Sequence, residues 1–352
     1  MKRRASDIHF EPQANGLRVR QRIDGFLVET DRVALSDASA ILSRLKIMGD
    51  LDIGEKRVPQ DGTLSFERLE GSYDIRISTI PTIYGEKIVL RLNKSKSVIS
   101  SLDELGMTSA QLNRAKRLLK QASGLVIVTG PTGCGKTTTL YAMLKALNQV
   151  ERNIITLEDP VELQIEGLNQ VQIHPKAGLT FARGLRAALR QDPDIIMIGE
   201  IRDRETADIA IGAALTGHLV LTTLHTADGA SVVTRLLDMK IEPYRVAAAL
   251  TGVIAQRLLR LLCKHCHGQR CDHCGNIGYF GRTGAFEVIT VDDGFRQLIV
   301  DQASLDQLRN YLRNQGIPTL KAAIKQKVDE GLTTVDEYLR VVNDAEEAFL
   351  EV

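Results

Sequence analysis

A glycine-rich segment in the middle of the sequence has the residue types and spacing of a phosphate-binding loop. Residues 130–137 fit the pattern G-x-x-x-x-G-K-[ST], with an apolar run before them and a helix-forming segment after them. The glycines let backbone N–H groups converge on phosphate oxygens, and the amino terminus of the helix adds partial positive charge. Lys136 is then expected at the terminal phosphates and Thr137 at Mg²⁺. This pattern predicts a nucleoside triphosphate site made by Gly130, Pro131, Thr132, Gly133, Cys134, Gly135, Lys136, Thr137 and Thr138.

Two acidic segments follow predicted strands further along the chain. Hydrolysis of a phosphoanhydride needs one group in the metal shell and another that orients or deprotonates water. Glu200 comes directly after the apolar run 195–198 and lies near Thr137 if the two strands are neighbours, which favours a role at Mg²⁺. Glu158 and Asp159 follow another strand and are expected to face the γ-phosphate from the opposite wall. Carboxylates that only cap the following helices are the alternative for both segments.

Two histidines flank the apolar run 219–224, with His218 before it and His225 after it. A histidine beyond the carboxyl end of a parallel strand can contact phosphate, whereas one at the amino end lies further away. In isolation, each is more often a structural hydrogen-bonding residue.

Arginines are dense in positions where a single domain would not need them. Phosphoryl transfer benefits from a guanidinium that a neighbouring subunit supplies. A solvated surface charge is the simpler interpretation of any one arginine taken alone. The candidates are Arg76, Arg91, Arg186, Arg190 and Arg202.

The elements that must position these residues follow from the apolar pattern. From residue 107 onwards, short apolar strands alternate with helices, which predicts an α/β domain with a mostly parallel sheet covered on both faces. Each motif lies just past the carboxyl end of a strand, where ligands bind in such sheets. The chain after residue 290 is expected to form amphipathic helices closed by glycines. We therefore expect one domain over residues 107–352, with these helices over 290–352.

Residues 1–95 have a different pattern of short alternating runs. Asp24-Gly25 offers a hairpin turn, and Ser36 can cap a helix that continues through about Met48. This segment predicts a small α+β domain. Residues 96–106 are polar and lack sustained periodicity, so they are the best candidate for a linker.

The composition limits the class of protein. At 352 residues the chain has room for more than one core, and two domains are the default expectation. Lys and Arg number 45 against 44 Asp and Glu, so the net charge of +1 does not indicate a protein that coats nucleic acid. No run of eighteen apolar residues exists, because Gln256, Arg257 and Arg260 interrupt the longest candidate. The first residues lack the apolar core of a secretory signal, so we expect a cytoplasmic location.

The four nucleotide-site blocks together closely resemble the secretion ATPase superfamily of type II secretion and type IV pili. They correspond to the Walker A, Asp, Walker B and His boxes of that family, at residues 130–141, 153–162, 189–210 and 216–229. Three further segments resemble the family's second amino-terminal domain, at residues 4–12, 20–25 and 74–92. The resemblance covers nearly the whole chain and implies a RecA-like P-loop ATPase domain after the small α+β domain. It also implies a homo-hexameric ring at the cytoplasmic face of the inner membrane, which turns a platform protein that adds pilin subunits.

The resemblance also implies roles for individual residues. Lys136 and Thr137 match the phosphate and magnesium ligands, Glu158 matches the general base, and Glu200 matches the Walker B acid. The matched His-box residues are His218 and His225. The matched arginines are Arg76 and Arg91 from the small domain, which the family contributes to nucleotide, and Arg186, Arg190 and Arg202 from the ATPase domain. Because the match begins at the second amino-terminal domain, the sequence is either a shortened chain or a short member of the family, as in the competence pseudopilus ATPases.

Four of the five cysteines lie within residues 263–274 as two C-x-x-C pairs, Cys263 with Cys266 and Cys271 with Cys274. Such clustering in a cytosolic protein favours metal ligands over disulfides. The pairs match those of the family, and four thiolates suit a structural tetrahedral Zn²⁺. Only four residues separate the pairs, so His265, His267 and His273 are substitutes if the short loop strains the geometry. Loose thiols or a disulfide are the alternative.

Three functions from different classes remain open. The first is an assembly motor that uses ATP, Mg²⁺ and a structural Zn²⁺ to extend a pilus, pseudopilus or type II secretion fibre. The paired cysteines favour it over the retraction motors, which resemble it in the four blocks but lack that element. The second is a nucleic-acid motor, which the near-zero charge disfavours, so we expect no direct nucleic-acid contact. The third is a nucleotide-gated scaffold that does not hydrolyse ATP.

Overall fold

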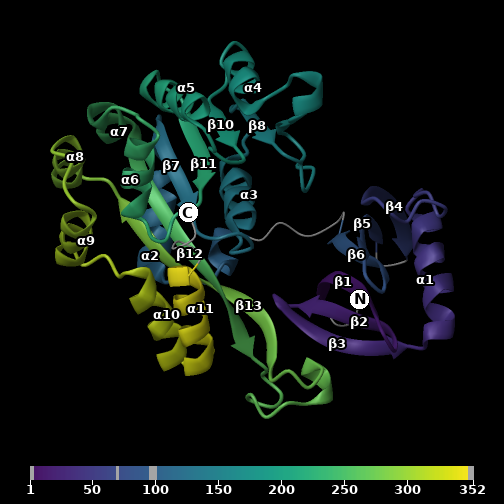
Figure 1. Cartoon of the computed structure of the whole chain (residues 1–352). Coiled ribbons are helices and arrows are strands. Elements are labelled where there is room, and N and C mark those ends of the chain that lie inside the picture. The colour runs from purple at the N-terminus through teal and green to yellow at the C-terminus, as the bar shows by residue number, and fades with distance from the viewer. Residues whose placement is uncertain (1–3, 69–70, 95–100, 348–352) are drawn as a thin grey trace. The chain divides into compact units, whose positions relative to one another are not determined.

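The computed structural model describes residues 4–68, 71–94 and 101–347 (Figure 1). The chain divides into two compact units, one of Met1–Val98 with Cys263–Gly281 and one of Ile99–Leu262 with Arg282–Val352. The cysteine-rich segment, which the sequence analysis assigned to the 107–352 domain, is thus grouped with the first unit. Residues 96–100 of the expected linker lie outside the described residues, and the domain limits stay a prediction.

A seven-stranded sheet forms the centre of the second unit, in the order β13-β12-β7-β11-β10-β8-β9. Neighbouring strands from β12 to β9 all run parallel, which confirms the predicted α/β class. The strands are β7 (Gly124–Thr129), β8 (Ile154–Glu158), β9 (Asn169–Gln172), β10 (Ile195–Ile198), β11 (Leu219–Leu224), β12 (Leu250–Leu262) and β13 (Tyr279–Thr290).

Helices supply the crossovers that parallel strands require. They are α3 (Lys136–Leu147) after β7, α4 (Phe181–Ala188) after β9, α5 (Arg204–Leu215) after β10, and α6 (Ser231–Asp238) with α7 (Pro243–Ala249) after β11. Before the sheet come the 3₁₀ turn Leu102–Glu104 and α2 (Ser109–Leu118), and further 3₁₀ turns lie at Pro175–Ala177 and Asp272–Cys274. This arrangement brings the carboxyl ends of the central strands to one edge of the sheet.

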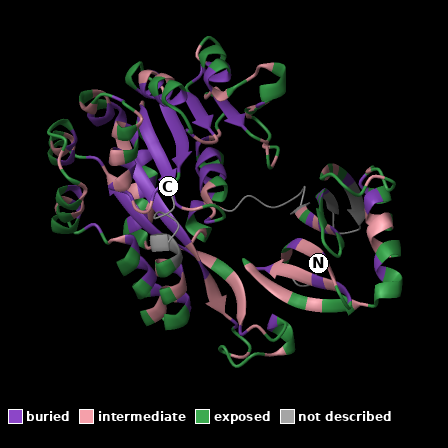
Figure 2. Ribbon diagram, viewed as in Figure 1, coloured by how far each residue is buried: buried purple, intermediate pink, exposed green. Residues whose placement is uncertain are grey.

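The two faces of β7 pack into two different hydrophobic cores. Leu125 and Ile127 join a core that includes side chains of α4 to α7, whereas Val126 and Val128 join one formed with α2 and α3. The strand is therefore buried at every position (Figure 2). Full burial of such side chains contributes about 1.5–3 kcal/mol each, which explains the continuous apolar runs in the sequence.

The predicted helices after residue 290 are present. They are α8 (Asp293–Val300), α9 (Leu305–Asn314), α10 (Leu320–Asp329) and α11 (Val335–Glu347). The first two join the core on the α5 side, and the last two pack with Ala255, Leu259 and Ala285 in a separate cluster. Within the described residues, no helix combines the length and the apolar character that crossing a membrane requires.

The first unit contains a six-stranded sheet in the order β3-β2-β1-β6-β5-β4, in which the paired neighbours run antiparallel. Asp24 and Gly25 both have positive φ at the β2–β3 turn, as a type I′ hairpin requires. The helix begins at Leu35, with Ala34 at the N-cap, so the expected cap by Ser36 is wrong. The elements are β1 (Ala5–Gln13), β2 (Gly16–Ile23), β3 (Phe26–Val33), α1 (Leu35–Met48), β4 (Gln60–Arg68), β5 (Gly71–Thr82) and β6 (Gly85–Lys94).

Candidate active site

The loop between β7 and α3 has the backbone that its glycines are needed for. Gly130, Gly133 and Gly135 have φ of 148°, 77° and 91°, a region that other residues rarely adopt. At the first of these, an added Cβ would lie 2.6 Å from the carbonyl oxygen of Gln256. The loop therefore folds tightly between its strand and its helix, as a phosphate-binding loop does.

A cavity of about 500 Å³ opens at the carboxyl edge of the sheet, beside this loop. Its size falls within the usual range for ligand sites, roughly 300–1,000 Å³. Besides the loop residues Thr132, Gly133, Gly135, Lys136, Thr137 and Thr138, the lining includes the sequence-predicted Glu158, Asp159, Glu200 and His225. The remaining loop residues Gly130, Pro131 and Cys134 do not line it. The cavity thus collects side chains that follow four different strands.

Glu200 reaches this cavity by a different arrangement from the one expected. Glu200 was expected near Thr137 if β10 and β7 were neighbours, but β11 lies between these strands. Glu200 and Thr137 nevertheless line the same cavity, because all three strands end at one edge. One Glu200 oxygen accepts a hydrogen bond from Arg202 Nη2 at 2.5 Å, and the other lies 3.9 Å from His225 Nε2.

Two basic groups face one another across the loop. Lys136 Nζ donates to the carbonyl oxygens of Gly130 and Pro131 at 2.8 and 3.0 Å, and it lies 3.5 Å from Nδ1 of His225. Burial lowers the pKa of Lys136, and both burial and the charge of Lys136 lower the pKa of His225. Because the charge of Lys136 disfavours a second cation at His225, this part of the cavity is suited to an anion.

Glu158 is held more firmly than Glu200. It is only 3% exposed, and its Oε1 accepts hydrogen bonds from Thr156 Oγ1 at 2.6 Å and from Gln170 Nε2 at 3.0 Å. The Tyr141 hydroxyl donates to Oε2. Asp159, the next residue, is exposed at the cavity wall.

The three residues that hold Glu158 were not among the predicted site residues. Thr156 could have been found, because it lies two residues before Glu158 and so on the same face of β8. Tyr141 and Gln170 come from α3 and β9, and no local pattern connects them to a carboxylate. Arg282 in β13 also lines the cavity and was likewise missed.

Four of the predicted histidines and arginines of the ATPase unit lie outside the lining of the cavity, and one of them is Arg202, which donates to Glu200. His218 is at the amino end of β11, where its Nδ1 is 3.0 Å from the Ala213 carbonyl oxygen. Arg186 forms an ion pair with Glu205 at 2.8 Å, and Arg190 donates to the Arg186 carbonyl oxygen. Their assignment to nucleotide stays a prediction.

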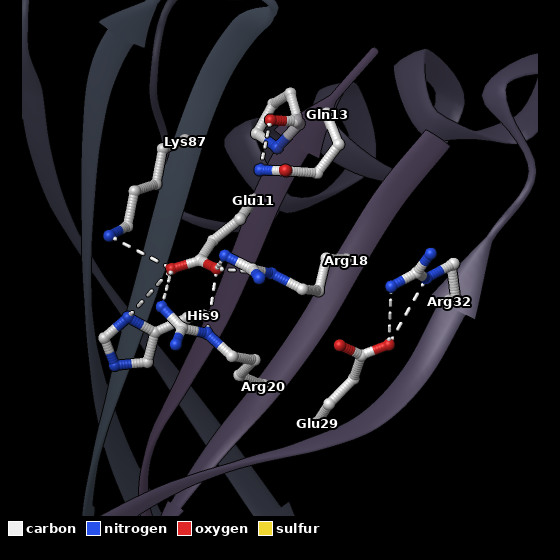
Figure 3. A network of polar contacts seen from close by, with 9 residues as sticks. His9, Glu11, Gln13, Arg18, Arg20, Glu29, Arg32 and Lys87 are labelled. Atoms are coloured by element: carbon white, nitrogen blue, oxygen red, sulfur yellow. Dashed lines mark hydrogen bonds and ion pairs between the residues drawn. The ribbon is translucent and has the colours of Figure 1, made fainter. Parts of the chain in front are cut away.

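The small unit presents a strongly basic sheet face. Glu11 in β1 is surrounded by Arg18 and Arg20 from β2 and by Lys87 from β6, with His9 Nδ1 4.0 Å away (Figure 3). Burial opposes ionisation of Glu11, but hydrogen bonds from Arg20, Lys87 and Arg18 outweigh it and lower its pKa to about 2. The single carboxylate of Glu11 therefore forms ion pairs with three cationic side chains, which leaves this face of the sheet with excess positive charge.

Arg76 and Arg91 lie opposite one another on β5 and β6, and both are exposed. Like charges in directly opposed positions destabilise a sheet, so this pair has a cost to the fold. Arg91 Nε donates to Asp7 Oδ1 at 3.1 Å. An anion bound between the two guanidinium groups would offset the cost, and their contribution to nucleotide stays a prediction.

The four clustered cysteines have the geometry of a metal site. All four Sγ atoms lie within 4.8 Å of one another, and all four residues are free thiols, which excludes the disulfide alternative in this structure. The Sγ atoms of Cys263 and Cys271 are 3.9 Å apart, and those of Cys266 and Cys274 are 3.8 Å apart. A tetrahedral site with Zn–S bonds of about 2.3 Å requires sulfur atoms about 3.8 Å apart.

The neighbouring histidines do not belong to this cluster. Among the described residues, the group that could hold a metal ion contains the four cysteines alone. His265 and His273 stack on one another with ring centroids 4.0 Å apart, and His273 also contacts the Phe280 ring at 4.3 Å. The short connection between the cysteine pairs thus closes a four-sulfur site without a histidine substitute.

Comparison with known proteins identifies what this site is similar to. The family described as Type II/IV secretion system protein matches residues 1–340. The type II secretion system protein HxcR of Pseudomonas aeruginosa is 48% identical over 97% of the chain and 74% of its own length. The type II secretion system ATPase E of Vibrio cholerae is 43% identical over 98% of the chain and 73% of its own length.

A longer relative and a solved structure agree with these matches. The type IV pilus assembly ATPase PilB of Thermus thermophilus is 44% identical over 95% of the chain, which spans 41% of the PilB length. The crystal structure of the pilus retraction motor PilT with bound ADP superposes with a TM-score of 0.67 at 28% identity, covering 96% of this chain and 93% of PilT.

Proposed function

Since the chain belongs to the type II/IV secretion system protein family and is an ATPase of that class, we propose that it powers the assembly of a type IV pilus, a pseudopilus or a type II secretion fibre. The observation that carries this proposal is the cavity in which the phosphate loop, Glu158 and Glu200 meet. The relatives named for assembly and secretion are 43–48% identical, whereas the retraction motor PilT is 28% identical. The four-cysteine element also favours assembly over retraction.

The proposed chemistry divides the cavity into two sides. Lys136 and the loop N–H groups bind the terminal phosphates, and the oxygens of Thr137 and Glu200 are ligands of the kind that Mg²⁺ prefers. Mg²⁺ would neutralise charge that develops on the phosphates. Glu158, on the other side, orients the attacking water and accepts its proton.

Charged groups beside the nucleotide complete this proposal. His225 lies between Lys136 and Glu200, where it can respond to the γ-phosphate. We assign Arg76 and Arg91 to the nucleotide of a neighbouring copy in a ring of six, because both opposed arginines are exposed and a phosphate between them would offset their repulsion more fully than the contact of Arg91 with Asp7 does. Arg202 connects Glu200 to the surface of the ATPase unit.

The proposal also includes a metal and partners. Four thiolates at tetrahedral spacing would hold a structural Zn²⁺. The ring would act at the cytoplasmic face of the inner membrane, peripherally, on a platform protein that adds pilin subunits. No contact with nucleic acid is part of it, and an ATPase rate unchanged by single- or double-stranded DNA at low salt would agree.

Turnover measurements test the division of roles. We expect slow ATP hydrolysis by the wild-type chain and at least a 100-fold loss in Glu158→Gln, within the range of about 10²–10⁴ for acid–base groups. Glu200→Gln should also lose most of its activity, because it removes a charged ligand from the Mg²⁺ side. Binding of a fluorescent ATP analogue should persist in Glu158→Gln, since that residue does not hold phosphate. Wild-type turnover in Glu158→Gln would remove the base assignment, and no turnover in the wild-type hexamer would favour the nucleotide-gated scaffold.

A further inference from the structure

We propose that Tyr141 is a positioning residue for ATP hydrolysis, which fixes the Glu158 carboxylate so that one oxygen lone pair faces the attacking water. This inference rests on the proposed role of Glu158. Tyr141 lies on α3, five residues after Lys136, and it is 5% exposed. The helix that begins at the phosphate loop therefore also contacts the opposite wall of the cavity.

The direction of the Tyr141 hydrogen bond is fixed by its surroundings. A phenolic oxygen can donate one hydrogen bond and accept two. Its acceptor positions receive the backbone N–H groups of Glu162 and Leu163 at 3.2 and 3.4 Å. The proton must therefore point to Glu158, whose ionised carboxylate can only accept.

Burial supports the same assignment. Burial raises the pKa of Tyr141, and the hydrogen bond to Glu158 raises it further. The phenol thus remains a donor throughout the pH range of an enzyme assay. A group that cannot lose its proton contributes orientation and not proton transfer.

Gln170 fixes the other carboxylate oxygen in a similar way. Its side-chain carbonyl accepts the backbone N–H of Ile165 at 2.7 Å, which turns its amide nitrogen towards Glu158 and the Leu163 carbonyl oxygen. Thr156 adds the second donor to the same Oε1. In the described part of the chain, Oε1 thus accepts two hydrogen bonds and Oε2 accepts one.

This count leaves a single position for water. An ionised carboxylate offers about four acceptor positions, two on each oxygen. With three taken by Thr156, Gln170 and Tyr141, the remaining one is on Oε2, and Glu158 lines the cavity. Tyr141 shares that oxygen with the water and so decides its geometry. The residue acts through Glu158 and does not touch the nucleotide.

The test is Tyr141→Phe in the full-length chain, which keeps the ring in its core and removes only the hydroxyl. We expect kcat to fall about 10-fold or more, as misplacing a catalytic group does, with the KM for ATP changed less than about 3-fold. Loss of a donor to the ionised carboxylate disfavours that form, so the rising limb of the kcat–pH profile should move to higher pH. Tyr311→Phe in α9 is the matched control, because it removes a tyrosine hydroxyl that donates to Asp292, and neither residue lines the cavity.

Three outcomes separate this inference from the one it rests on. In the Glu158→Gln background, Tyr141→Phe should cause less than a 2-fold further loss, because its effect passes through the carboxylate. A full additional loss in that background, or a Tyr141→Phe profile with an unmoved limb, overturns the positioning role while Glu158 keeps its own. Wild-type turnover in Glu158→Gln overturns the base assignment itself, whatever Tyr141→Phe does.

Discussion

Glu287 provides a quantitative test of how the ATPase unit is held together. It lies in β13, 5% exposed, where its Oε2 accepts the backbone N–H of Gly229 at 2.9 Å. Burial raises the pKa of Glu287 from 4.5 to about 7, and the nearby Asp228 adds to this effect. The Gly229 hydrogen bond and the cations Arg309 and Arg257 oppose it.

The sign of the effect on stability follows from proton binding. Between pH 4.5 and about 7 the folded chain keeps the Glu287 proton that the unfolded chain has lost. Stability therefore falls as pH rises through this window and levels off above it. The shift is 7 minus 4.5, or 2.5 pKa units. At about 1.4 kcal/mol per unit, the loss is about 3 kcal/mol.

Glu287→Gln removes this cost and keeps an oxygen that can accept the Gly229 N–H. The free energy of unfolding in urea, followed by circular dichroism, should be nearly equal for the two chains at pH 4, below the unfolded pKa of 4.5. By pH 8 the variant should be more stable by about 3 kcal/mol. Glu151→Gln on an exposed loop is the control, and it should follow the wild type. A difference between wild type and Glu287→Gln that is the same at both pH values would refute the reasoning.

Two further predictions concern the phosphate loop and the cysteine cluster. Gly130→Ala should weaken ATP binding at least 10-fold in a fluorescence titration, because Gly130 has a φ of 148° and an added Cβ would lie 2.6 Å from a carbonyl oxygen. Gly212→Ala in α5 is the control: an added Cβ there meets nothing within 4 Å, so this variant should bind ATP as the wild type does. The purified chain should contain about one equivalent of zinc by mass spectrometry, and Cys271→Ser with Cys274→Ser should lower it below about half, while Cys134→Ala leaves it unchanged. Zinc below half an equivalent in the wild type would contradict the structural site.

The sequence was sufficient for those parts of the site that depend on local patterns. The phosphate loop needs positive φ angles at Gly130, Gly133 and Gly135, and glycine adopts these angles most easily. The spacing of the three glycines can therefore be recognised in the sequence. The position of Glu200 and His225 followed from the rule that ligands bind at the carboxyl ends of parallel strands. These side chains do line one cavity.

Features that depend on strand order or on distant partners could not be derived in this way. The placement of β11 between β7 and β10 is set by packing across the whole sheet, and no segment encodes it locally. Tyr141 and Gln170 reach Glu158 only because α3 and β9 pack beside β8. Both look like ordinary core or surface residues in the sequence, and a buried hydrogen-bond network gives no periodic signal.

The two acidic sides of the cavity differ in a way that bears on how a motor could use ATP. Glu158 is buried, and three donors hold it, so moving it would leave buried polar groups unpaired at about 1–3 kcal/mol each. Arg202 is 66% exposed, and an ion pair of that kind with Glu200 contributes only about 0–1 kcal/mol. Rearrangement on loss of the γ-phosphate should therefore begin with Glu200, Arg202 and the nearby His225. Glu158 would remain in place between turnovers, so one side of the site would keep its catalytic geometry while the other transmits the change.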